Sequence, residues 1–203
     1  MTTAAIVLGF LAFLLGACPF SLWLGRRFLG SDIRGYGDRN PGAANVFRAG
    51  GRFLGGLAVA LDMGKGIPFV AAAYYVYDLP ERVVLGIGMA AILGSAFSPF
   101  LHFRGGKSLA VTGGVMLATP ERELFVAAVV FLILGALFMD RAAWMVMFSV
   151  SSVTAWLIIL GRSVAQVWFM VGVCVVLAYT HRHDLRQAPE LINRLSQWQR
   201  PAR

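Results

Sequence analysis

The stretch AAIVLGFLAFLLGACPFSLWL, residues 4–24, decides the fold because it holds no charged side chain and is long enough to cross a bilayer as a helix. Apolar side chains make up 58% of the 203 residues and charged ones only 14%, which leaves too few polar groups to cover a water-soluble domain. We therefore predict an all-α integral membrane protein. Further apolar stretches lie at about residues 53–77, 83–101, 109–119, 124–139, 142–160 and 163–179.

These stretches predict one domain over residues 1–203, a compact bundle of about seven transmembrane helices at 1–180 with a polar tail at 181–203. The stretch at 109–119 is short, so it can cross only if it is tilted, buried among neighbours or extended by the glycine loop before it. In the tail, Ile192, Leu195 and Trp198 recur at helical spacing, which predicts a short amphipathic helix on the membrane surface.

The formal net charge of +8 follows the expected topology. With seven spans and the N-terminus outside, Lys65 lies within a span and Arg82, Arg122 and Arg162 lie in outer turns, while every other Lys and Arg is on the inner side. This arrangement obeys the positive-inside rule, and the opposite orientation violates it. We therefore expect a cytoplasmic C-terminus and no nucleic-acid partner.

The polar stretch GYGDRNPGAANVFRAGG, residues 35–51, is where function is expected. Asn40, Asn45, Arg48 and Arg52 are too polar to face lipid, and the glycines allow backbone N–H groups to approach an anion closely. This combination of residues favours a ligand that carries phosphate.

A second polar stretch, HFRGGKS at residues 102–108, resembles a nucleotide-binding loop only in part. A Walker A motif needs a glycine at position 101, where this chain has leucine, and it follows a strand rather than a membrane span. The remaining pattern, a Gly-Gly turn that opens a helix beside Arg104 and Lys107, is typical of anion binding at a helix N-terminus.

Both polar stretches, Arg141 and the segment His181-Arg-His-Asp184 fall on the inner face, which predicts one site there. Topology alone explains many of the arginines but not the glycines and asparagines.

The three histidines lack a second carboxylate or a cysteine at ligand spacing, so we expect no metal. For His181, an anion contact, a proton carrier and a solvated tail residue remain open. Asp62 and Lys65, three residues apart, form either a structural ion pair or part of the phosphate site.

Taken together, these motifs resemble the bacterial acyl-phosphate:glycerol-3-phosphate acyltransferases (PlsY). Asp38-Arg-Asn40-Pro-Gly42-Ala-Ala-Asn45-Val-Phe-Arg48 is similar to that family's Ser-x-Asn-x-Gly-Ala-Thr-Asn-x-x-Arg loop. Asp62-Met-Gly-Lys65-Gly is similar to its Asp-x-x-Lys-Gly, Phe103-Arg-Gly-Gly-Lys107 to its Phe-Lys-Gly-Gly-Lys, and His181-Arg-His-Asp184 to its His-Arg-x-Asn. Order and spacing agree over nearly the whole chain.

The resemblance implies transfer of a fatty acyl group from acyl phosphate to the 1-hydroxyl of glycerol 3-phosphate, giving lysophosphatidic acid and phosphate for phospholipid synthesis. It implies a monomer, without a cofactor, at the cytoplasmic face of the bacterial inner (plasma) membrane. The residues expected to be catalytic are Lys107, Arg48 and His181. The substrate-binding residues expected are Asp38, Asn40, Gly42, Asn45, Arg104, Gly105, Gly106 and Asp184, with an electrostatic or structural role for Asp62 and Lys65.

The chain departs from the family pattern at several positions. Asp38, Ala44 and Asp184 stand where the family has Ser, Thr and Asn, while Ser95 replaces a His and Trp144 lies in an altered Arg-Tyr-Val-Ser stretch. We expect arginines such as Arg39 to compensate the two carboxylates, or the ligand to differ. Alternatives are a paralogue that binds or senses lipid phosphates without turnover and a small transporter or channel, which is expected to carry more ionisable residues within its spans.

Overall fold

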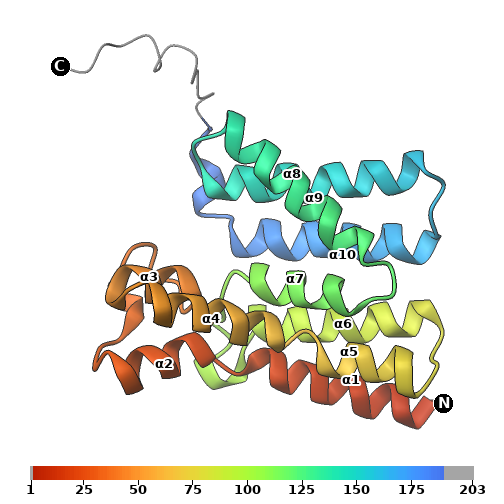
Figure 1. The fold of residues 1–203 in the computed structure, drawn as a ribbon, viewed down its shortest axis with the longest axis horizontal. Coiled ribbons are helices and arrows are strands. Elements are labelled where there is room, and N and C mark those ends of the chain that lie inside the picture. Colours follow the sequence, from red (N-terminus) through yellow and green to blue (C-terminus); the bar gives the residue numbers. More distant parts are fainter. Residues whose placement is uncertain (1, 190–203) are drawn as a thin grey trace.

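The computed structural model describes residues 2–189, and the regular structure in this part of the chain is entirely helical (Figure 1). This confirms the predicted all-α class. The predicted amphipathic helix around Ile192, Leu195 and Trp198 lies outside the described residues. In chain order the elements are α1 (Thr2–Ala17), α2 (Phe20–Phe28), η1 (Ile33–Gly35), α3 (Ala43–Gly50), α4 (Arg52–Gly64), α5 (Pro68–Ala71), η2 (Ala72–Val76), α6 (Glu81–Ala96), η3 (Pro99–Leu101), α7 (Leu109–Ala118), α8 (Glu123–Phe138), α9 (Ala142–Ile159), α10 (Val164–Thr180) and η4 (Asp184–Arg186).

Four helical segments are long and apolar enough to cross a membrane, namely Thr2–Phe28, Arg52–Val76, Glu81–Leu101 and Ala142–Ile159. The shorter apolar helices α7, α8 and α10 coincide with the remaining predicted stretches. Each predicted stretch therefore corresponds to a helical segment, and α7 is the short one, as the sequence indicated. The count of seven spans and the orientation of the termini stay predictions.

Two of the long segments are broken at prolines. Pro19 separates α1 from α2, and Pro68 begins α5 after the turn that ends α4. Proline has no N–H to continue the helical hydrogen-bond ladder, so each break leaves carbonyl groups available. The carbonyl of Cys18 at the first break accepts a hydrogen bond from Lys65 Nζ at 3.0 Å, which ties the two breaks together within the bundle.

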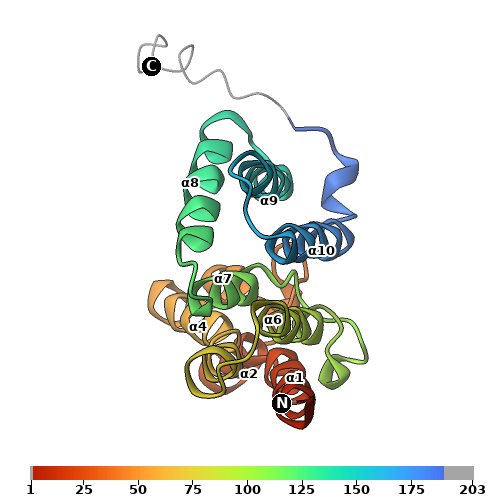
Figure 2. The same ribbon diagram turned by 90° about the vertical axis from the view of Figure 1, so that its right-hand side faces the viewer.

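The helices form two groups with α7 between them (Figure 2). On one side lie α1, α2, α4 and α6, and on the other α8, α9 and α10. α6 packs against α1, α7 and α10, while α7 also contacts α4 and α8. The main hydrophobic core contains most of its buried residues in α6, α7, α9 and α10, with further ones from α1, α5, η2 and α8.

The polar stretch at residues 35–51 contains a helix that was not predicted from the sequence. α3 covers Ala43–Gly50, and its Val46 is fully buried in a small core with Leu22, Ile33 and Ala58. Gly51 then adopts φ 103°, a left-handed conformation that glycine tolerates, and the chain turns into α4. The alternation of polar and apolar residues in this stretch hid an amphipathic helix.

Glycines allow α1 and α6 to approach at backbone contact. A Cβ at Gly16 would strike the carbonyl of Ala91, and one at Gly94 would strike the carbonyl of Phe13. Small residues at such crossings are how membrane helices pack, because lipid supplies no hydrophobic driving force between them. Ser98 adds a hydrogen bond of 2.6 Å from its Oγ to the Ala17 carbonyl.

We therefore expect Gly94→Ala to lower stability by about 1–3 kcal/mol, because the added methyl group must separate two backbones. Gly86→Ala on the same helix is the matched control, since a Cβ there meets nothing within 4 Å. Thermal unfolding in detergent micelles measures both variants. Equal unfolding temperatures for the two variants would contradict this packing.

Candidate functional site

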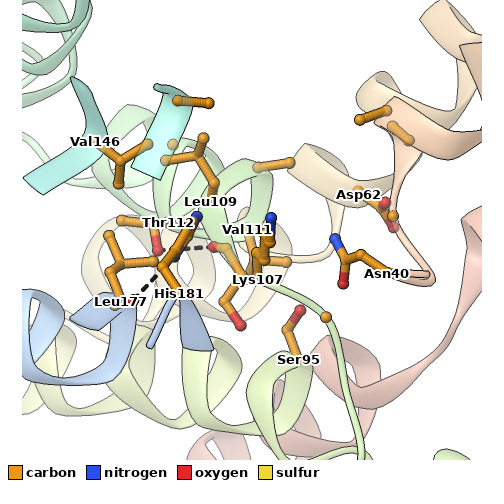
Figure 3. Close-up of a pocket in the computed structure, with 18 of the residues that line it drawn as sticks. Asn40, Asp62, Ser95, Lys107, Leu109, Val111, Thr112, Val146, Leu177 and His181 are labelled. Carbon is orange, nitrogen blue, oxygen red and sulfur yellow. Dashed lines mark hydrogen bonds between the residues drawn. The ribbon is translucent and has the colours of Figure 1, made fainter. Parts of the chain in front are cut away.

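A cavity of about 810 Å³ opens where the two polar stretches meet the helix bundle (Figure 3). Its polar end is lined by residues of the 35–51 stretch, by the segment before α7, and by the segment after α10. Its other part, which we call the apolar arm, runs between α4, α7, α8 and α9. The apolar arm is lined by Val59 and Met63 of α4, Val111, Gly113 and Met116 of α7, Phe125, Ala128, Val129 and Leu132 of α8, and Val146 and Val150 of α9.

Lys107 is at the centre of the polar end, and in Figure 3 it lies between Asn40 and His181. Its Nζ is 2.6 Å from Asp38 Oδ2 and 2.6 Å from Asp184 Oδ2. Thr180 Oγ1, at the end of α10, also donates to the Lys107 backbone carbonyl at 3.3 Å. One lysine therefore connects three segments that are far apart in the sequence.

The charges of this cluster compensate one another. Burial alone would raise the pKa of the Asp38 carboxyl, but the hydrogen bond and charge of Lys107 outweigh it, and the pKa lies below its usual value. Burial alone would likewise lower the pKa of Lys107, yet its hydrogen bonds to Asp184 and Asp38 raise that pKa. Asp38 and Lys107 are thus stabilised in their charged forms.

The compensation of Asp38 differs from the sequence expectation, which named Arg39. Asp38 accepts hydrogen bonds from Lys107, from Asn45 Nδ2 at 2.9 Å and from the Asn40 backbone N–H at 3.2 Å. Arg48 Nη1 lies 3.7 Å away. Arg39 is exposed and sits at a turn with φ 61°. Sequence distance was misleading here, because the fold brings a cation from 69 residues away.

Asn45 shapes the polar stretch from within. Its side chain is fully buried, donates to Asp38 and to the Asn40 carbonyl at 2.8 Å, and accepts a hydrogen bond of 2.6 Å from Arg48 Nη1. It lies behind the cavity wall rather than in it. Asn45 therefore positions Asp38, Asn40 and Arg48, which do line the cavity.

Two helix N-termini point their first residues at the cavity. Gly42, Ala43 and Ala44 line it at the start of α3, and Lys107, Ser108 and Leu109 line it at the start of α7. The first amides of a helix have no acceptor within the helix and carry a partial positive charge, so both ends favour an anion.

The Gly-Gly turn before α7 is held against α6. Gly105 and Gly106 donate backbone hydrogen bonds to the Ala96 and Ser95 carbonyls at 3.1 and 3.0 Å. A Cβ at Gly105 would collide with the Ser95 carbonyl, so glycine is needed there for packing. Ser95, at the position where the family has a His, contributes its carbonyl to this turn and also lines the cavity.

His181 is 3% exposed and lines the cavity directly after α10. Its Nδ1 is 2.9 Å from the Leu177 carbonyl, which can only accept, so Nδ1 carries the proton of the neutral ring and Nε2 keeps a free lone pair. Burial lowers the pKa of His181, so the ring is neutral near pH 7. The site thus holds a neutral imidazole with an acceptor nitrogen.

Asp62 and Lys65 form the predicted ion pair, with Nζ 2.9 Å from Oδ1, at the level where the α1–α2 break meets α4. They are 8% and 6% exposed. Ser21 Oγ donates to the second Asp62 oxygen at 2.5 Å, and Lys65 also donates to the Cys18 carbonyl. Both residues line the cavity, but their polar atoms are already occupied by one another and by α1–α2.

Besides Asn45, two of the predicted substrate-binding residues do not line the cavity. Arg104 is exposed and lies outside the lining, as does Gly105. Arg141, which the sequence grouped with the polar stretches in one predicted site, also lines the cavity. The lining further includes Cys18, Ser98, Thr112 and Gln187, which the sequence did not single out as ligand contacts. Cys18 faces the cavity because Pro19 breaks the first span beside it.

The segment after α10 crosses to the start of α9. Arg141 Nε donates to the Ala188 carbonyl at 3.1 Å, and its guanidinium also bonds to the Gln187 side chain. Trp144 Nε1 donates to the Gln187 carbonyl at 2.9 Å. Trp144, one of the departures from the family pattern, therefore helps to hold this segment beside the polar end of the cavity.

A family model described as glycerol-3-phosphate acyltransferase matches residues 6–190. The glycerol-3-phosphate acyltransferase of Levilactobacillus brevis is 33% identical over 186 residues, which cover 87% of this chain and 86% of that protein. That of Sulfurimonas denitrificans is 33% identical over 188 residues, covering 89% and 81%. Each of these relatives is named as an enzyme, so they give no support to a lipid-binding protein without turnover.

The fold is similar to that of PlsY (YgiH), an integral membrane glycerol 3-phosphate acyltransferase, in the crystal structure of its glycerol 3-phosphate form. The TM-score is 0.82 at 24% sequence identity, over 97% of this chain and 99% of that one. This likeness shows that the two chains share a fold.

The buried ion pair of Asp62 and Lys65 is expected to contribute to stability. Lys65→Met leaves Asp62 without its cation inside the bundle, so we expect a loss of about 3–5 kcal/mol, as for other broken buried pairs. Asp62→Leu combined with Lys65→Met removes both charges and should recover a large part of that loss. A double-mutant cycle on unfolding temperature in micelles tests this. Additive losses would show that the two side chains do not stabilise one another.

Proposed function

The chain belongs to the glycerol-3-phosphate acyltransferase family, and from this membership we propose that it transfers a fatty acyl group from acyl phosphate to the 1-hydroxyl of glycerol 3-phosphate. The products are lysophosphatidic acid and inorganic phosphate. The observation that carries the proposal is a single cavity that joins a polar end with three cations to the apolar arm. An acyl phosphate has the same two parts, a phosphate and an alkyl chain.

The phosphate groups of the two substrates would be held at the polar end. Lys107, Arg48 and Arg141 supply positive charge, and the N-termini of α3 and α7 supply backbone amides. Asn40, Gly42 and Gly106 line the part nearest those helix ends and would contact the acyl phosphate. Arg48 and Lys107 would contact glycerol 3-phosphate.

A bound phosphate takes the place of a carboxylate on Lys107. In the structure, Asp38 and Asp184 both form ion pairs with this ammonium group. When phosphate binds, the carboxylates become free to accept hydrogen bonds from the glycerol hydroxyls, which are donors. The two departures from the family pattern are then compatible with the same substrates, because their charges are balanced by Lys107 before binding.

In the reaction, the C1 hydroxyl oxygen of glycerol 3-phosphate attacks the carbonyl carbon of the acyl phosphate. The new C–O ester bond forms as the bond from that carbon to the phosphate oxygen breaks, and phosphate leaves. His181 Nε2 takes the hydroxyl proton and returns it to the leaving phosphate. Lys107 and the α7 amides stabilise the charge on the carbonyl oxygen.

A protein nucleophile is not needed, because an acyl phosphate is already activated. Cys18 lines the cavity, but its thiol lies 3.5 Å from the Leu14 carbonyl as a weak donor. Positioning of two bound substrates and stabilisation of charge supply the catalysis.

The proposed setting is the bacterial inner membrane. The four long helices and the shorter α7, α8 and α10 together make seven spans, with the N-terminus outside and the polar end of the cavity at the cytoplasmic face. A helix shorter than the bilayer can span where neighbours bury its ends, which supports α7 as a span. A monomer is proposed, since one chain contains the whole cavity.

Release of phosphate from purified protein supplied with palmitoyl phosphate and glycerol 3-phosphate tests the reaction. Lys107→Ala should lower kcat/KM at least about 100-fold, because it removes the central cation. Arg82→Ala removes an exposed cation from the start of α6 and is the control, with unchanged activity expected. If the wild type is silent while Asp38→Ser with Ala44→Thr gains activity, the proposal that this chain is an active enzyme fails.

The pH dependence of kcat/KM tests His181. Because burial lowers its pKa, the ring stays an active base to lower pH than an ordinary histidine, and activity should fall only as pH drops through that lowered pKa. His181→Gln should lower kcat/KM by about 10²–10⁴-fold and abolish this acid limb. An acid limb that persists in the variant would instead assign the proton to a substrate phosphate, which titrates near pH 6.

A further inference from the structure

Gly113 occupies an unusual position on the wall of the apolar arm. It lies on the α7 face that also carries Leu109, Thr112 and Met116, and all of these residues line the cavity. A Cβ built at Gly113 stands 3.5 Å from Phe125 Cε2 of α8 and 3.7 Å from Met63 Cε of α4, both ordinary contact distances. The missing Cβ thus leaves a methyl-sized space beside two bulky residues that also line the arm.

The neighbouring glycine serves a different purpose. A Cβ at Gly114 would collide with the backbone carbonyl of Met63, so Gly114 is required for α7 to pack against α4. The atoms nearest to a Cβ at Gly113 are all side-chain carbons, two from Phe125 and one from Met63. Packing therefore explains glycine at 114 but not at 113.

We propose that Gly113, between Met63 and Phe125, determines how long an acyl chain the apolar arm accepts. The inference rests on the proposed function, since it assumes that the arm holds the acyl chain of the substrate. A chain whose carbonyl carbon reacts beside Lys107 must pass over Gly113 to reach the arm beyond it, where Met116 lies. Any side chain larger than a methyl group at 113 fills this passage.

The distances along α7 set where the block falls. At a rise of 1.5 Å per residue, Gly113 lies roughly 6 Å along α7 from Leu109, the first residue of that helix, and Met116 roughly 10 Å. A leucine at 113 therefore leaves the first part of the arm open and closes the rest. Short acyl chains should still bind, whereas the far end of a long chain can no longer enter the arm.

The test compares octanoyl phosphate with palmitoyl phosphate, each with glycerol 3-phosphate, in wild type and in Gly113→Leu. We expect kcat/KM for palmitoyl phosphate to fall at least about tenfold, in line with the loss of one or two methylene contacts in a hydrophobic pocket. Activity on octanoyl phosphate should change less than about twofold. Leucine also favours helix more than glycine does, so α7 should remain formed.

Two further variants make the result specific. Gly86→Leu on α6 is the matched control, because it introduces the same side chain into open space outside the cavity and should leave both substrates unaffected. Phe125→Ala in the Gly113→Leu background removes the ring opposite the new side chain and should restore part of the palmitoyl activity. Unfolding temperatures in micelles establish that the variants are folded.

The outcomes separate the inference from the proposed function. If the wild type turns over both substrates and Gly113→Leu lowers both equally or neither, the inference is wrong. No change on either substrate would mean that the acyl chain leaves the arm before Gly113. Failure of Phe125→Ala to restore any activity would also overturn it. If the wild type releases no phosphate from either acyl phosphate, the proposed function itself fails.

Discussion

The site depends on one ammonium group shared by two carboxylates. Lys107 joins the segment before α7 to Asp38 in the first polar stretch and to Asp184 after α10. Without this cation, two negative charges would face each other in a partly buried cavity, where their repulsion is costly. With it, three segments from the beginning, middle and end of the chain converge, and the polar end of the cavity has a defined shape.

Close helix packing brings these segments within reach of one another. The glycine contacts between α1 and α6 bring the α1–α2 break beside Ser98, while Gly105 and Gly106 fix the start of α7 against the end of α6. The buried Asp62–Lys65 pair then holds α4 against the same break. The polar cluster is therefore supported by close backbone packing between helices and by one buried ion pair.

Much of the fold could be predicted from the sequence, because membrane-spanning helices are recognisable as long apolar stretches. The helical segments, the Asp62–Lys65 pair and the gathering of the polar stretches all followed from residue type and spacing. Three features did not. α3 was hidden because Val46 is one buried residue within a polar stretch, and the partner of Asp38 was missed because Lys107 is distant in sequence. The place of Asn45 behind the wall depends on side-chain direction, which spacing does not reveal.

The ion pairs of Lys107 with Asp38 and Asp184 also affect how a bound anion leaves. Asp38 and Asp184 lie beside the Lys107 ammonium group. When a bound phosphate leaves, its place is taken by a carboxylate, so the lysine charge stays paired in a cavity that is partly apolar. One ion pair replaces another, and opposite charges need not be separated at low dielectric, which would be slow. Under the proposed reaction, the same carboxylates compete with any anion that offers Lys107 only one contact. Under the proposed reaction, Asp38 and Asp184 therefore take over the contact with Lys107 as the product phosphate leaves.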